Sequence, residues 1–172
     1  MPDLVPVLRK DEIQRIVGEM GQKISSDYQG RELILIGILN GAFIFLSDLI
    51  RQLTIPVKVD FIRAASYGSG TSTSGKIQLT KEIEIDIKGK DVIMVEDIVD
   101  TGLTLNYILE HVKSFGPRSV RVCALLDKIE RRQSGIAVDY AGYQVPKGFL
   151  VGYGLDYAEE YRHLPAIYHL QP

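Results

Sequence analysis

The chain lacks the features that would tie it to an oxidising compartment, a membrane or a polyanion. Its 172 residues include one cysteine, so no internal disulfide can form, and Cys123 lies in the apolar stretch 120–126, where we expect a buried side chain instead of a nucleophile. No apolar run approaches the roughly 18 residues of a membrane-spanning helix, and no signal-peptide pattern opens the chain. The 22 acidic residues outnumber the 20 basic ones, which argues against a dominant nucleic-acid-binding surface. We therefore expect a cytoplasmic protein without a membrane or nucleic-acid partner.

Apolar periodicity along the chain predicts a single α/β domain spanning residues 1–172. Apolar residues at three- and four-residue spacing predict helices over 11–26, over 42–53 and from 105 onward. Continuous or alternating apolar runs predict strands over 33–39, 57–65, 92–95, 119–126, 138–143 and 149–152. This alternation indicates a parallel sheet flanked by helices on both faces, with ligands bound beyond the carboxyl ends of the strands.

Three segments depart from this alternation. Residues 66–75 contain no apolar side chain except the Tyr67 ring, so we interpret them as a mobile loop. Residues 76–87 alternate apolar and polar side chains and predict an antiparallel arm. Residues 153–172 are interpreted as a tyrosine-rich tail.

The most informative segment runs from Val92 to Thr104. An apolar strand ends in the adjacent carboxylates Glu96 and Asp97, and a short hydroxylated loop then leads into a helix. The free N–H groups at a helix start carry partial positive charge and bind phosphate, and Gly102 allows a close approach. Carboxylates repel phosphate but suit sugar hydroxyls or Mg²⁺. The segment therefore predicts a site for a phosphorylated sugar.

This segment resembles the phosphoribosyl-pyrophosphate signature of the type I phosphoribosyltransferases, in the form typical of the hypoxanthine-guanine (6-oxopurine) branch. The resemblance covers residues 11–164 and implies a parallel sheet with helices, a flexible lid over about residues 66–80, and a hood from the N-terminal segment and about residues 128–172. It also implies transfer of ribose 5-phosphate from phosphoribosyl pyrophosphate to N9 of hypoxanthine or guanine, with Mg²⁺ as cofactor. A homodimer or homotetramer is expected.

The resemblance implies a role for each residue that matches a family motif. Ribose phosphate would be bound by Glu96, Asp97, Asp100, Thr101, Gly102, Leu103 and Thr104, with Asp100 also the catalytic base. Pyrophosphate would be bound by Asn40, Gly41 and Arg162, and the lid would contribute Ser66 and Tyr67. The purine would contact Lys128, Phe149 and Leu150, and Mg²⁺ would contact Glu96, Asp97 and Asp156. Asn40 departs from the family pattern, because many members carry lysine there, which puts a side-chain cation contact in doubt.

Each of these residues also has a purely structural alternative. Asn40-Gly41 is typical of a simple turn, the 66–75 loop of a hairpin tip, and Lys128 of a solvated surface charge. Phe149 can be a core aromatic, and Arg162 can pair with Glu159 on the surface.

Three other functions remain open at this level. A xanthine-preferring phosphoribosyltransferase would use the same chemistry. An RNA-binding regulator of nucleotide synthesis on the same fold would need a basic face, which the net charge of −2 does not favour. A catalytically silent nucleotide-binding subunit is disfavoured, because the positions expected to carry catalysis are filled.

Overall fold

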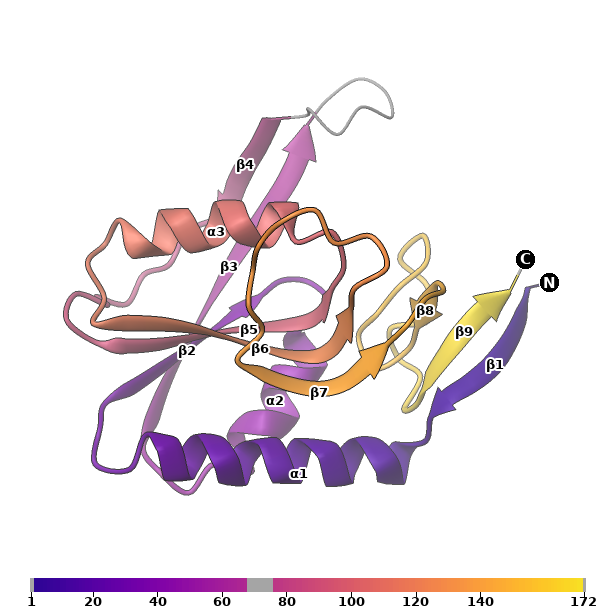
Figure 1. Ribbon diagram of the computed structural model, residues 1–172, viewed down its shortest axis with the longest axis horizontal. Coiled ribbons are helices and arrows are strands. Elements are labelled where there is room, and N and C mark those ends of the chain that lie inside the picture. Colours follow the sequence, from indigo (N-terminus) through magenta and orange to yellow (C-terminus); the bar gives the residue numbers. More distant parts are fainter. Residues whose placement is uncertain (1, 68–75, 172) are drawn as a thin grey trace.

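A six-stranded sheet runs through the middle of the computed structural model, which describes residues 2–67 and 76–171 (Figure 1). Its strands are β2 (Leu33–Ile38), β3 (Val57–Tyr67), β4 (Lys76–Lys81), β5 (Asp91–Val99), β6 (Ser119–Lys128) and β7 (Tyr140–Val145). The spatial order is β4-β3-β2-β5-β6-β7, and all neighbours are parallel except β3 and β4. The predicted parallel α/β sheet is confirmed, with one antiparallel strand at its edge.

Helices cover both faces of this sheet, which explains why its central strands are apolar throughout. The helices α1 (Lys10–Asp27) and α2 (Phe43–Ile50) lie on one face, and α3 (Leu103–Lys113) lies on the other (Figure 1). Side chains alternate along β2, so Leu33 and Leu35 pack with α1 and α2, whereas Ile34 and Ile36 pack with α3. Cys123 is buried in the same sheet, and burial raises the pKa of its thiol, as expected for an inert cysteine. None of the helices in the described ranges has the length and apolar character to cross a membrane.

A second, three-stranded antiparallel sheet joins the two ends of the chain. It consists of β1 (Asp3–Leu8), β9 (Ile167–Gln171) and β8 (Leu150–Val151), in the order β1-β9-β8. Figure 1 places it beside the carboxyl end of β7, with both termini close together. The segment 153–172, interpreted as a tyrosine-rich tail, contributes the strand β9 to this sheet. β7, which falls within the range expected for the hood, instead pairs with β6 in the main sheet.

Three predicted boundaries are corrected by hydrogen bonding. β5 continues past Val95 to Val99, because Glu96, Ile98 and Val99 pair with β6, so the acidic pair lies in the strand and not after it. α2 ends at Ile50 because the next turn is closed by short i→i−3 bonds from the amides of Gln52 and Leu53. The antiparallel arm forms only over Lys76–Lys81.

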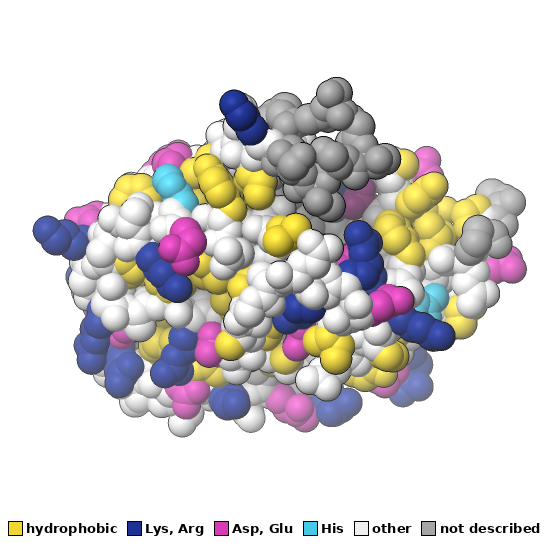
Figure 2. All heavy atoms as spheres, turned by 45° about the horizontal axis from the view of Figure 1, so that its top comes forward, with side chains coloured by type: hydrophobic (Ala, Val, Ile, Leu, Met, Phe, Trp, Pro, Cys, Tyr) yellow, Lys and Arg dark blue, Asp and Glu magenta, His cyan; other side chains and the backbone are white. Residues whose placement is uncertain are grey.

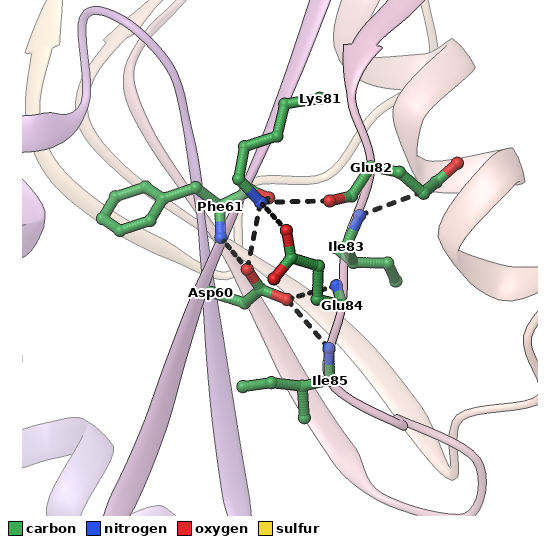
Figure 3. A network of polar contacts seen from close by, with 7 residues as sticks. All are labelled: Asp60, Phe61, Lys81, Glu82, Ile83, Glu84 and Ile85. Atoms are coloured by element: carbon green, nitrogen blue, oxygen red, sulfur yellow. Dashed lines mark hydrogen bonds and ion pairs between the residues drawn. The ribbon is translucent and has the colours of Figure 1, made fainter.

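The rest of the predicted arm is held by a buried carboxylate instead of a strand ladder. Asp60 of β3 accepts hydrogen bonds from the backbone amides of Glu84 (2.6 Å), Ile85 (3.0 Å) and Phe61 (2.7 Å) (Figure 3). The Lys81 ammonium lies 3.3 Å from the same carboxylate. Burial alone would raise the pKa of Asp60, but these amides and Lys81 stabilise the charged form and hold the pKa below its ordinary value.

Replacing Asp60 with asparagine is expected to lower the free energy of unfolding at pH 7 by about 1.5–3 kcal/mol, because an amide cannot accept all these bonds. The folded-state pKa lies below the unfolded value of about 3.9, so the native carboxylate contributes stability above that pH and loses it as the pH falls through the folded-state pKa. Urea unfolding of both proteins at pH 7 and near pH 3 should show the difference shrinking at acid pH. Glu84→Gln, which removes a nearby exposed charge without touching the amides, should change little at either pH.

Candidate active site

The carboxyl ends of three adjacent parallel strands bring the predicted site residues to one edge of the sheet. β2, β5 and β6 are neighbours, and they lead into the loops that begin near Asn40, Asp100 and Lys128. Loops that follow neighbouring parallel strands lie side by side. The three loops therefore converge beyond the carboxyl ends of the strands, where the sequence predicted ligands to bind.

The loop after β5 has the geometry of a phosphate cradle. Gly102 caps α3 with φ of 82°, a left-handed conformation that favours glycine, and α3 begins at Leu103. The Thr101 hydroxyl oxygen accepts a hydrogen bond of 3.3 Å from the Leu103 amide. This 11-residue helix follows the carboxyl end of β5, and the amides of its first turn have no acceptor within the helix. An anion placed there would meet N–H donors and the positive end of the helix.

The acidic pair lies in the last part of β5. The Glu96 carboxylate accepts a bond from the Asp97 amide (3.1 Å), and the Asp97 carboxylate accepts one from the Ile98 amide (2.8 Å). Burial, and then the negative charge of Asp97, raise the pKa of the Glu96 carboxyl well above its ordinary value. Such a pair suits donors such as sugar hydroxyls and repels phosphate.

The loop after β2 lies directly against this acidic pair. The peptide between Leu39 and Asn40 is cis, and Asn40 is exposed. A Cβ atom on Gly41 would overlap the Asp97 carboxylate, so glycine is needed for this close approach. Gly154 lies against the Gly41 carbonyl in the same way, with φ of 99°. The segment around Gly154 therefore packs closely against the backbone of the loop after β2.

One cavity of about 200 Å³ gathers most of the residues predicted to contact the base and the metal. Its lining comprises Asp97, Ile98, Asp100, Lys128, Gly148, Phe149, Leu150, Leu155 and Asp156. Six of these nine residues were predicted from the sequence as site residues. A larger hollow of about 570 Å³ between α1, α2 and the C-terminal segment is lined by none of the predicted site residues.

Lys128 and Asp100 both line this cavity and form an ion pair with each other. Lys128 is only 6% exposed, so it is not the solvated surface charge considered as an alternative, and its Nζ lies 3.6 Å from Asp100 Oδ2. Arg131 Nη1 lies 3.6 Å from the same oxygen. Asp100 Oδ1 is buried and has no hydrogen-bond partner among residues 2–67 and 76–171. A buried oxygen without a partner is uncommon and points to a functional role for Asp100.

The structure contradicts the structural alternative for Phe149, a core aromatic, but shows the one for Arg162, an ion pair with Glu159. Phe149 is 51% exposed and makes a T-shaped contact with the Tyr157 ring, with centroids 5.6 Å apart, so it is not a core aromatic. Arg162 does pair with Glu159 (3.1 Å), and it also contacts Asp156 (3.4 Å) and donates to the Gly154 carbonyl (2.7 Å). A phosphate ligand would therefore have to compete with two carboxylates for this guanidinium.

The predicted lid residues lie at the end of the β3–β4 hairpin. Ser66 and Tyr67 are the last two residues of β3, opposite Ile77 and Lys76 of β4. Of the rest of the expected lid, about 66–80, residues 76–80 belong to β4 and residues 68–75 lie outside the described residues.

The loop between β6 and β7 also contacts the site, although it was not predicted from the sequence. Arg132 donates to the carbonyls of Val99 and Asp100, and the Ser134 hydroxyl is so close to Gly102 that a Cβ there would overlap it. The only signal in the sequence was the basic pair Arg131-Arg132 soon after Lys128, which is weak because such pairs are common on surfaces.

The comparisons with known proteins agree with this geometry. Residues 7–158 match the family described as "Phosphoribosyl transferase domain". The hypoxanthine phosphoribosyltransferase of Salmonella typhimurium (strain LT2) is 44% identical over 158 residues, covering 91% of this chain and 89% of that enzyme. The hypoxanthine-guanine phosphoribosyltransferase of Mycobacterium avium is 42% identical over 172 residues, covering 96% of this chain and 85% of that enzyme.

Solved structures give the same relationship. The crystal structure of a hypoxanthine-guanine phosphoribosyltransferase from Bacillus anthracis is 44% identical, with a TM-score of 0.91 and 96% of both chains covered. That of a hypoxanthine phosphoribosyltransferase from Staphylococcus aureus is 42% identical, with a TM-score of 0.93, covering 97% of this chain and 91% of that one. The chain therefore belongs to the phosphoribosyltransferase family, in its hypoxanthine and hypoxanthine-guanine branch.

Proposed function

We propose that the protein is a purine salvage enzyme that transfers ribose 5-phosphate from phosphoribosyl pyrophosphate to N9 of hypoxanthine or guanine, giving IMP or GMP and pyrophosphate. This proposal is carried by one cavity, which is lined by Lys128, Asp100 and the exposed aromatic ring of Phe149. The cavity lies beside the loop that leads into α3. A planar base and a sugar phosphate fit these two neighbouring environments.

In this proposal each environment handles one part of the substrates. The α3 amides and the Thr101 and Thr104 hydroxyls bind the 5-phosphate, and Glu96 and Asp97 hold the ribose hydroxyls. Lys128 donates to the 6-oxo group of the base, and Phe149 stacks on its plane. The free oxygen of Asp100 accepts the proton at N7, so that N9 presents its lone pair to C1 of the ribose. Fixing both substrates in this orientation is the main source of rate enhancement, since no covalent intermediate with the protein is needed.

We further propose Mg²⁺ as cofactor, held by Asp97 and Asp156, with Glu96 beside them. Asp97 and Asp156 line the same cavity, and hard carboxylate oxygens are the donors that Mg²⁺ prefers. Within residues 2–67 and 76–171 no group of three or more acidic, His or Cys side chains forms a complete metal cage. That donor set fits Mg²⁺, which commonly uses one or two carboxylates together with substrate phosphates and water. When bound, it would neutralise charge on the departing pyrophosphate.

The proposal is tested by measuring turnover with hypoxanthine, guanine, xanthine and adenine, each with phosphoribosyl pyrophosphate and Mg²⁺. Hypoxanthine or guanine should have the highest kcat/KM. A clear preference for xanthine would establish the xanthine-specific alternative instead. No turnover with any 6-oxopurine would overturn the proposed reaction.

Replacing Gly154 with alanine is expected to raise the KM for phosphoribosyl pyrophosphate roughly tenfold, because the new Cβ would displace the Gly41 backbone by a fraction of an ångström to about 1 Å. Gly89→Ala is the matched control, since Gly89 also has positive φ (71°) but no atom lies within 4 Å of its new Cβ. That variant should lose about 1 kcal/mol of stability through backbone strain and keep its KM. Equal kinetic effects in both variants would show that strain alone, and not the contact with Gly41, is responsible.

The remaining expectations concern partners and location. We propose a cytoplasmic homodimer or homotetramer, which sedimentation analysis would test. An RNA-binding role gains no support from the face in Figure 2, where basic and acidic side chains are interspersed instead of forming a continuous basic patch. A salt-dependent RNA-binding measurement would decide this point.

A further inference from the structure

Arg132 joins the two halves of the site from outside the cavity. Its Nε donates to the Asp100 carbonyl (3.0 Å), and its Nη2 donates to the carbonyl of Val99 (3.3 Å). Val99 is the last residue of β5, and Asp100 opens the loop of residues 100–102 that leads into α3, which we call the phosphate loop. The same Nη2 also reaches the Lys128 carbonyl (3.3 Å) and forms an ion pair with Asp127, both at the end of β6. One guanidinium thus contacts the backbone on the ribose-phosphate side and on the base side.

The contact is built into the interior and is not a chance surface pair. The side chains of Arg132 and Asp127 are only 16% and 12% exposed. A second hydrogen bond joins the loop between β6 and β7 to the phosphate loop, because the Gln133 amide donates to the Thr101 carbonyl (2.8 Å). Ion pairs of this kind, shielded from solvent and hydrogen-bonded to backbone, hold geometry far better than exposed pairs do.

Arginine is suited to this position for a geometric reason. Its planar guanidinium presents five N–H donors in a rigid fork, so it can bridge several acceptors at set directions. Lysine carries the same charge, but its three donors radiate from one atom at the end of a flexible stem. A lysine here could neutralise Asp127 but could not hold the carbonyls of Val99 and Asp100 at the same time.

We propose that Arg132 is a positioning residue that sets the spacing between the phosphate loop and the base-contacting end of β6, with Asp127 orienting its guanidinium. This inference rests on the proposed reaction, because that reaction needs N9 of the base and C1 of the ribose to be held at a defined separation. Arg132 itself lines no part of the cavity. Its effect is therefore on the alignment of two bound substrates and not on the binding of either one.

This role predicts a specific kinetic pattern. In Arg132→Lys, the single-turnover rate constant and kcat should fall roughly 10- to 50-fold, since misalignment by a fraction of an ångström mainly slows the chemical step. The KM values for phosphoribosyl pyrophosphate and hypoxanthine should change by less than about threefold. Asp127→Asn should lower kcat in the same direction by a smaller factor. Arg121→Lys is the matched control, because Arg121 lies on β6, the strand that precedes the Arg132 loop, and donates to the Tyr140 hydroxyl (3.2 Å) away from the cavity. It should leave kcat and both KM values unchanged.

The measurements combine rapid-quench single turnover of the whole protein, saturation kinetics with both substrates, and thermal unfolding of each variant. A fall in kcat that exceeds the loss of folded protein at the assay temperature, absent from Arg121→Lys, supports the inference. A kcat that is unchanged, or that falls only in proportion to the folded fraction, overturns it while leaving the proposed reaction intact. A rise in one KM without a fall in kcat also overturns it. Absence of turnover in the unmodified protein would overturn the proposed reaction, and the inference with it.

Discussion

Replacing Asp100 with asparagine is expected to lower kcat by roughly 10²- to 10⁴-fold, the usual contribution of general acid–base catalysis. The variant keeps the size and shape of the side chain, but the amide cannot take a proton from the base. The buried oxygen Oδ1 has no hydrogen-bond partner among the described residues, whereas Oδ2 already faces Lys128 and Arg131 at 3.6 Å each. The KM for phosphoribosyl pyrophosphate should change far less, since the backbone amides of the loop remain in place.

The measurement is single-turnover formation of IMP, because slow product release can hide a loss of chemical rate. Asp86→Asn is the control, since Asp86 is an exposed carboxylate that accepts a bond from the Lys88 amide and lies outside the cavity. A single-turnover rate for Asp100→Asn equal to that of the unmodified protein would remove Asp100 from its assigned role.

The main sheet was predictable because its strands carry their own signal. Both faces of β2 and β5 are covered by helices, so residues such as Leu35 and Ile36 are apolar in succession, and the pattern appears in a short window of sequence. In the small sheet only β8 was predicted, within the strand expected over 149–152, and β1 and β9 were missed for the opposite reason. β1 is mostly exposed, contains Pro6, and pairs with β9 at the far end of the chain, so neither strand has a clear local pattern.

The site divides in a similar way. Glu96, Asp97 and Asp100 could be placed from the sequence because a strand, a loop and a helix start follow one another within 13 residues. Lys128 and Phe149 could be placed only through the family resemblance, since nothing local distinguishes them from surface or core residues. Arg132 could not be found at all, because its importance lies in carbonyls of β5 that are distant in sequence and become neighbours only through the pairing of β5 with β6.

Lys128 offers a physical basis for base selection. Its ammonium is buried, so it has little access to water, and its three N–H groups are donors without any acceptor. A 6-oxo group satisfies such a donor. A 6-amino group brings further N–H donors to the same place, so the buried ammonium keeps Asp100 as its partner but gains no acceptor from the base, at a cost of about 1–3 kcal/mol or more.

The protein is therefore expected to use hypoxanthine over adenine by a factor of at least roughly 10² in kcat/KM, since sites built to recognise one hydrogen-bonding group discriminate by up to roughly 10⁴–10⁵. Lys128→Ala should lower kcat/KM for hypoxanthine and guanine together, by roughly 10- to 10²-fold, because both present the same oxygen. Competition assays with all three bases, run on the unmodified protein and on Lys128→Ala, measure both effects. Lys147→Ala is a suitable control, as Lys147 is exposed and lies outside the cavity lining. Comparable use of adenine and hypoxanthine by the unmodified protein would contradict the assignment of 6-oxopurines as substrates. Loss of guanine use alone in Lys128→Ala would place the contact of Lys128 elsewhere on the base.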